Sequence, residues 1–328
     1  MIKNFHIGIA VYNEAKNIRN SLIYLENSLK NIDRKYKFDL IICPNGCTDN
    51  SEEVLDEIKK EFTFPIKLIS SKKGKLFAHK KILGSIDDKN PVIFMDADIL
   101  VPAKTINDLL EYLDKNHNVY IISAYPYAVK PKRLTFYQKI TYPILNIKRI
   151  YPMIEVSKYN ITKFHIDATN EFERKSRIYF HGRCFIVRNK EVYAFPKERS
   201  KIRGDDTFLS LKILNERPKG SIKVLYNSPV YSVPLLSVKK YLNTWYRIRK
   251  DLDHIYTEYP EFLHLKKKTK MKLNWNYIIS SLPFEYKLSA VGFYFLRIYE
   301  SVSYFVLKPW INLENIWKYD RKESFEGE

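Results

Sequence analysis

Cysteine, glycine and long apolar runs are all scarce in this chain of 328 residues. Three cysteines (Cys43, Cys47 and Cys184) are too few and too scattered for a disulfide framework or a zinc site, so we expect reduced thiols in a cytoplasmic protein. Only 9 glycines exclude collagen-like and low-complexity classes. Charged residues at Arg297 and Glu300 interrupt the longest apolar stretch, so the sequence predicts no membrane-spanning helix.

Acidic residues are also outnumbered, because 56 Lys and Arg stand against 37 Asp and Glu and give a formal net charge of +19. Residues 119–204, which are also rich in aromatics, carry +12 of that charge. Such an excess indicates an anionic partner: a nucleic acid, a phosphorylated small molecule or an acidic membrane surface. Hydrophobic residues make up 45% of the chain and aromatics 15%, which excludes intrinsic disorder.

The first 125 residues alternate between short apolar strands and helices. We expect strands at 5–11, 38–43, 66–69 and 92–95, and helices at 14–29, 52–62, 76–86 and 104–113. This order predicts an α/β fold with a Rossmann-like, mostly parallel central sheet and flanking helices. Ligands of such sheets bind in the loops at the carboxyl ends of the strands. Residues 119–204 are expected to be extended, and the chain after about residue 237 to be a C-terminal helical extension.

Two carboxylates, Asp96 and Asp98, follow the apolar strand that ends at Met95. Alternate residues of a strand share a face, so these two side chains are able to converge above the sheet edge. Their mutual repulsion favours a cation between them, and Mg²⁺ or Mn²⁺ would also bind a substrate diphosphate. The alternative is that Asp96 caps the next turn and Asp98 is solvated.

Five ordered motifs resemble those of family 2 glycosyltransferases, whose nucleotide-diphospho-sugar-binding fold is called GT-A. The resemblance covers roughly residues 4–232 and is carried by Val11–Ile18, Pro44–Ser51, Lys73–Lys75 with Ala78, Asp96–Asp98, and Gly204–Lys212. It implies a transferase that moves a sugar from a nucleotide-diphospho-sugar to a hydroxyl group, with inversion and with bound Mn²⁺ or Mg²⁺. UDP-sugars are the favoured donors, although Asn45 stands where the family usually has an acidic residue.

The resemblance also implies roles for individual residues. Residues expected to bind the donor are Val11, Tyr12, Asn13, Glu14, Asn45, Lys75, Asp96 and Ala97. Residues expected to face the acceptor are Gly182, Arg183 and Asp205. Asp206 is expected to be the general base, and the metal ligands are expected to be Asp98, Asp96 and His254. The alternatives are a capping role for Asp205 and Asp206 at a helix N-terminus and a surface position for His254.

Residues 1–236 are therefore expected to form the GT-A catalytic domain, with the donor bound by 1–118 and the acceptor by 119–236. The basic region suits an anionic or lipid-linked glycan acceptor. Residues 237–328 are expected to form a helical, basic and aromatic region. Its Lys266–Lys272 cluster suits peripheral binding to the inner face of an anionic membrane, and the alternative is a helical cap that buries its aromatics.

Two other functions fit less of the sequence. A nucleotidyltransferase on a similar fold would need a glycine-rich, arginine-containing loop after the first strand, where the chain has Val11–Glu14. A protein that binds nucleic acid or another anionic polymer would explain the charge, but no recognised nucleic-acid module occurs. We therefore expect no nucleic-acid partner.

Overall fold

The computed structural model describes residues 1–87, 89–150, 179–198, 200–217, 221–266 and 282–311. Within them the chain forms two compact units and passes between these units more than once. The first unit contains residues 1–126 and 179–232, and the second contains 127–150, 233–266 and 282–311. The sequence predicts that residues 1–118 bind the donor and residues 119–236 bind the acceptor, and both roles stay a prediction.

The first unit is built on an eight-stranded sheet in the order β3-β2-β1-β4-β7-β6-β8-β5. Its strands are β1 (Asn4–Val11), β2 (Lys37–Pro44), β3 (Ile66–Leu68), β4 (Val92–Asp96), β5 (Ile99–Leu100), β6 (Ile121–Ala128), β7 (Cys184–Val187) and β8 (Ile222–Ser232). Strands β3, β2, β1 and β4 run parallel, and β7 then pairs with β4 in the antiparallel sense. The expected α/β class is confirmed, with the parallel part of the sheet confined to the N-terminal strands.

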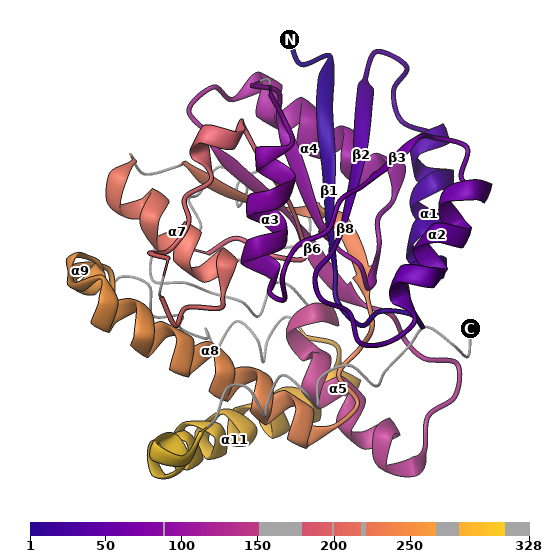
Figure 1. Cartoon of the computed structure of the whole chain (residues 1–328). Coiled ribbons are helices and arrows are strands. Elements are labelled where there is room, and N and C mark those ends of the chain that lie inside the picture. The colour runs from indigo at the N-terminus through magenta and orange to yellow at the C-terminus, as the bar shows by residue number, and fades with distance from the viewer. Residues whose placement is uncertain (88, 151–178, 199, 218–220, 267–281, 312–328) are drawn as a thin grey trace. The chain divides into compact units, whose positions relative to one another are not determined.

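Helices cover both faces of this sheet (Figure 1). One layer holds α1 (Ile18–Lys30), α2 (Ser51–Glu61) and α4 (Ala103–Lys115), and the other holds α3 (Lys75–Gly84) and α7 (Asp205–Glu216). Successive strand residues enter opposite layers, as Ile93 and Phe94 of β4 do. At Gly8 of β1 an added Cβ would lie 2.9 Å from Ile82 of α3, so only glycine lets this helix lie so close to the strand.

Helix α1 begins at Ile18, four residues later than expected. The backbone from Glu14 to Ile18 forms a turn instead, in which Glu14 O accepts from Asn17 N and Ile18 N. The Glu14 N–H donates to a residue outside the turn, Ser51, whose Oγ accepts at 2.8 Å. This contact ties the loop after β1 to the start of α2.

The second unit is helical and contains α5 (Phe136–Ile150), α8 (Val238–Glu258), α9 (Leu263–Lys266) and α11 (Phe284–Leu307). The expectation of extended structure was wrong for α5. Its start is fixed by a capping box in which Thr135 N donates to Gln138 Oε1 at 3.0 Å and Gln138 N donates to Thr135 Oγ1 at 3.2 Å. Most of the predicted lysine cluster falls in residues 267–281, outside the described part of the chain.

Candidate active site

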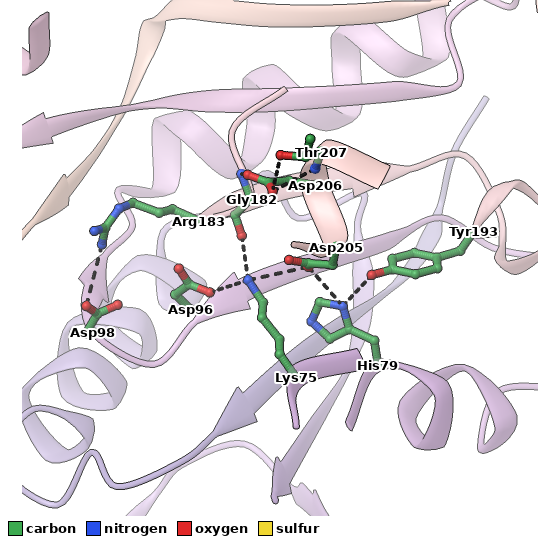
Figure 2. Close-up of polar contacts among 10 residues, drawn as sticks. All are labelled: Lys75, His79, Asp96, Asp98, Gly182, Arg183, Tyr193, Asp205, Asp206 and Thr207. Carbon is green, nitrogen blue, oxygen red and sulfur yellow. Dashed lines mark hydrogen bonds and ion pairs between the residues drawn. The ribbon is translucent and has the colours of Figure 1, made fainter. Parts of the chain in front are cut away.

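The candidate site lies where strand β4 ends at Asp96. The backbone N–H of Asp96 donates to Arg183 O at 2.8 Å, which continues the β4–β7 pairing by one residue. That bond brings Gly182 and Arg183, two residues of the expected acceptor loop, beside the Asp96–Asp98 motif. Figure 2 shows these residues with Lys75, Asp205 and Asp206. The structure therefore brings together residues that are up to 131 positions apart, counting from Lys75 to Asp206.

Lys75 lies at the centre of the group. Its Nζ donates to Asp96 Oδ1 at 2.7 Å and to Gly182 O at 3.0 Å, and it lies 3.5 Å from Asp205 Oδ2 (Figure 2). Lys75 is the first residue of α3, and Gly74 precedes it with φ 131°, a backbone conformation that only glycine adopts easily. The glycine therefore lets the chain turn into α3 with Lys75 aimed at the carboxylates.

Burial and the neighbouring charges shift the pKa values of Lys75 and Asp96. Burial on its own would lower the pKa of Lys75, but the carboxylates of Asp205 and Asp96 outweigh burial and raise that pKa. Burial raises the pKa of Asp96, Lys75 opposes the rise, and the negative charge of Asp98 adds to it. Lys75 is thus held as a cation at neutral pH, and Asp96 and Asp98 are near enough to repel each other.

Asp206 accepts hydrogen bonds on both carboxylate oxygens. Thr207 N donates to Oδ1 at 2.7 Å, and Gly182 N donates to Oδ2 at 3.2 Å (Figure 2). Burial and the charge of Asp205 raise the pKa of Asp206, whereas Lys75 and the two N–H groups oppose that rise. A raised pKa makes a carboxylate a stronger proton acceptor, so Asp206 is suited to accept a proton from a hydroxyl group.

Asp205, which precedes Asp206 in the sequence, points toward His79 of α3. Its Oδ2 lies 3.4 Å from His79 Nδ1, and His79 Nδ1 lies 2.6 Å from the hydroxyl of Tyr193 (Figure 2). Burial and the cation of Lys75 hold the pKa of His79 well below its usual range, so this imidazole is neutral. His79 is thus a buried residue of the scaffold that also contacts the site. Tyr193 was missed by sequence reasoning, which had no signal for it, whereas the i, i+4 spacing of Lys75 and His79 indicates a shared helix face.

The N-cap of α7 is Gly204, which has no side chain to cap the helix, and Asp205 and Asp206 are the first two helical residues. Their charges lie in the first turn, where the helix dipole favours them. Asp205 and Asp206 therefore stabilise the helix N-terminus through their negative charge, and neither of them is the N-cap residue.

Asp98 and Asp96 fit a divalent cation by the chemistry of their oxygen atoms. Asp98 Oδ2 faces Arg183 Nη1 at 3.5 Å, and one oxygen of Asp96 is bound by Lys75. Within the described residues no three His, Cys, Asp or Glu side chains gather as a metal site. Two carboxylates whose remaining partners are substrate phosphates and water are a common Mg²⁺ arrangement.

His254, the third expected ligand, lies on α8 in the second unit. Its Nδ1 is buried and makes no hydrogen bond to the residues that the structure describes. Its ligation of the same ion as Asp98 stays a prediction.

The expected donor loops meet after β1 and β2. Asn13, with φ 54°, accepts from Thr48 N through its Oδ1 at 2.7 Å. Asn45 is buried; its Nδ2 donates to Val11 O at 2.8 Å and its Oδ1 accepts from Gly74 N at 3.1 Å. Asn45 therefore joins the end of β1 to the start of α3, a scaffolding role that the sequence did not indicate.

The other expected donor residues surround these loops. Lys73 Nζ lies 4.9 Å from the ring centre of Tyr12, and Glu14 accepts from Asn17 Nδ2 at 3.0 Å. Ala97 is buried between the two aspartates of its motif. Contact of any of these residues with a donor stays a prediction. The three cysteines are free thiols, as expected.

The fold and the site together define an α/β enzyme with a lysine and several carboxylates at the ligand-binding edge of its parallel strands. The sequence model of Glycosyl transferase family 2 matches residues 6–189, more than half of the chain. The protein therefore belongs to glycosyltransferase family 2, and the expected family membership and enzyme class are confirmed.

Two further likenesses agree with this assignment. The chain is 25% identical over 133 residues to a dolichol-phosphate mannosyltransferase of Pyrococcus furiosus, a match that covers 40% of this chain and 36% of that protein. It is also similar to the structure of a mannosyltransferase from Pyrobaculum calidifontis in complex with GDP-Man and Mn²⁺. That likeness has a TM-score of 0.52 at 15% identity and covers 97% of this chain and 84% of the other. It confirms the GT-A fold.

Proposed function

We propose that the protein transfers a sugar from a nucleotide-diphospho-sugar, with UDP-sugars preferred, to a hydroxyl group of an anionic or lipid-linked glycan, with inversion at the anomeric carbon. The observation that carries the proposal is the pairing of Lys75 with Asp96 and Asp205 beside Asp206, at the edge where β4 ends. The name of the dolichol-phosphate mannosyltransferase supports a lipid-linked acceptor for this chain, although only 36% of that protein is matched.

Asp206 is proposed as the general base. As the acceptor oxygen forms its bond to the anomeric carbon, the hydroxyl proton passes to a carboxylate oxygen of Asp206, and the bond from that carbon to the diphosphate breaks. Gly182 N and Thr207 N hold the carboxylate in place through this step. Because attack and departure occur on opposite sides of the carbon, the product is inverted.

The nucleoside diphosphate leaves with additional negative charge. Asp98 and Asp96 would hold a divalent cation, which supplies charge neutralisation for the diphosphate when it is bound. Lys75 and Arg183 are the cations of this chain that already lie beside those carboxylates. Both contribute positive charge at the edge that the phosphates of a donor would approach.

The test is release of nucleoside diphosphate from a panel of UDP- and GDP-sugars with Mn²⁺, with and without added phospholipid-linked or oligosaccharide acceptors. We expect UDP-sugars to be consumed and Asp206→Asn to lower kcat by roughly 10²–10⁴-fold with donor binding little changed. Asp56→Asn is the matched control, because Asp56 is exposed on α2. Consumption of GDP-sugars alone would overturn the donor preference, and normal turnover by Asp206→Asn would overturn the base assignment.

A further inference from the structure

Helix α11 has its apolar side chains on the outside. Seven large apolar residues recur at alternating spacings of four and three, which places them on one helix face: Phe284, Leu288, Val291, Phe295, Ile298, Val302 and Phe305. All seven are exposed, and the exposed fractions of Phe284 and Phe305 are 82% and 84%. A helix on the surface of a protein in water normally has the opposite orientation.

The inward face of α11 is held by polar contacts. Glu300 is fully buried and forms ion pairs with Arg249 of α8 and with Arg297 of its own helix. Beside it, Tyr304 OH donates to Asp253 of α8 at 2.8 Å. Ala290 and Phe293 are buried on this side of the helix as well. The inward face of α11 is therefore the one that pairs with α8, and the apolar face lies outward.

Helix α5 packs against α11 and also exposes apolar side chains. Its first turns expose Phe136, Tyr137 and Ile140, with Phe136 81% exposed. An open groove of about 330 Å³ lies between the two helices and the start of α8, and its lining is mostly apolar, with Ile144 of α5 and Phe295 of α11 among its residues. We use the name α5–α11 face for this surface, defined as the seven α11 residues above together with Phe136, Tyr137 and Ile140.

Four exposed basic residues lie beside the α5 part of this face. Lys130, Lys132 and Arg133 immediately precede the helix, and Lys139 lies between Tyr137 and Ile140. Exposed aromatic and aliphatic side chains next to lysine and arginine are the pattern of proteins that lie on anionic membranes. In the part of the chain that the structure describes, none of the helices has the length and apolar character needed to cross a bilayer.

We propose that the α5–α11 face docks on the surface of an anionic lipid bilayer. The apolar side chains of α11 enter the boundary between headgroups and acyl chains, and Lys130, Lys132, Arg133 and Lys139 contact lipid phosphates. A bilayer is favoured over a second copy of this chain by charge complementarity, because two copies with a net charge of +19 each repel one another. The proposal concerns lipid binding alone and does not depend on sugar transfer.

The test is co-sedimentation of the full chain with vesicles of phosphatidylcholine, with and without about one-third phosphatidylglycerol. Two triple variants divide the face: Leu288→Ser, Val302→Ser, Phe305→Ser removes apolar contacts, and Lys130→Gln, Lys132→Gln, Arg133→Gln removes charge. We expect the wild-type protein to bind the anionic vesicles and each triple variant to need roughly tenfold more lipid for half-binding. Salt of about 0.5 M should weaken the binding of the wild-type protein to anionic vesicles, toward the level of the variant that lacks the three basic residues.

Matched control variants distinguish the effect of the α5–α11 face from the effects of net charge and of exposed apolar side chains elsewhere. Lys37→Gln, Lys59→Gln, Lys60→Gln changes the net charge equally on exposed residues of the first unit, and Ile23→Ser removes an exposed apolar side chain of α1. Both controls should bind like the wild-type protein, and circular dichroism should show every variant folded. Absence of binding at low salt, or equal losses in variants and controls, overturns the proposal. Dimers in sedimentation velocity that the apolar variant abolishes, without vesicle binding, would instead assign the face to self-association.

Discussion

Replacing Lys75 by methionine removes the positive charge at the centre of the acidic cluster while keeping a side chain of similar length. The Nζ atom lies 2.7 Å from Asp96 and 3.5 Å from Asp205. Removing one partner of a buried ion pair costs about 3–5 kcal/mol of unfolding free energy. Side-chain exposure is 26% for Lys75 and Asp96 and 7% for Asp205, so water relieves part of the loss. We expect the variant to be less stable by about 2–4 kcal/mol at neutral pH.

This loss should depend on pH, because carboxylates that lose their cation take up protons more readily. In the wild-type protein Lys75 lowers the pKa of both Asp96 and Asp206, so their pKa values in the folded variant are higher still. A carboxylate whose pKa is raised by folding adds stability below its unfolded pKa, and this contribution is lost as the pH rises through the folded-state pKa. The stability deficit of the variant should therefore be larger at about pH 8 than at about pH 5.

Urea denaturation followed by circular dichroism at these two pH values measures both effects. Lys80→Met is the matched control, because Lys80 is an exposed residue of the same helix. Lys75→Arg retains the charge and should recover part of the stability. If Lys75→Met and Lys80→Met unfold at the same urea concentration, or if the deficit is the same at both pH values, the electrostatic account of the cluster is wrong.

Three further predictions concern the same site. Gly182→Ala should lower both turnover and stability, the latter by about 1–3 kcal/mol, because the new Cβ would lie 2.9–3.0 Å from the side chain of Asp206; unchanged kinetics and denaturation would contradict this packing. The acid limb of the kcat profile should lie above the ordinary aspartate pKa of about 3.9, because burial and Asp205 raise the pKa of Asp206 and a base acts only when ionised; Lys75→Arg should keep that limb, and a limb at or below the ordinary value would argue for another base. EDTA should weaken UDP binding in calorimetry, with Mn²⁺ restoring it and Asp98→Asn reproducing the loss, whereas equal affinity with and without Mn²⁺ would exclude the proposed role of Asp98 and Asp96.

The parallel half of the fold was predictable because its signals are local. The strands are short apolar runs and the helices place apolar residues on one face, so the elements from Phe5 to Leu113 were foreseen to within a few residues at nearly every end, except the two-residue strand β5, which was missed. The start of α1 differs because its first turn depends on Ser51, which is 37 positions from Glu14. Helix α5 was missed although Thr135 and Gln138 form a capping box at its start and the helix contains a proline, Pro143.

The pairings within the site could not be derived in the same way. The sequence indicates that Asp96, Lys75 and Asp206 belong to motifs, and a parallel sheet predicts that their loops share an edge. It does not indicate that Lys75 pairs with Asp205, or that the side-chain amide of Asn45 forms hydrogen bonds with the backbone of Val11 and Gly74. Both sets of contacts join segments that are distant in the chain: Asn45 is 34 positions from Val11 and 29 from Gly74, and Lys75 and Asp205 lie on two different helices.

The orientation of helix α11 could not be predicted from the sequence either. Periodicity divides this helix into an apolar face and a face that carries Arg297 and Glu300, but it does not tell which face is inward. The ordinary assumption buries the apolar face, whereas here the face with Glu300 and Phe293 lies inward. A carboxylate buried away from water needs a partner, because an unpaired buried charge is costly, and Arg249 of α8 supplies a cation for Glu300 from outside the helix. That partner lies about fifty positions earlier in the chain and is not visible in the periodicity of α11, so the orientation of the helix could not be predicted from its own sequence.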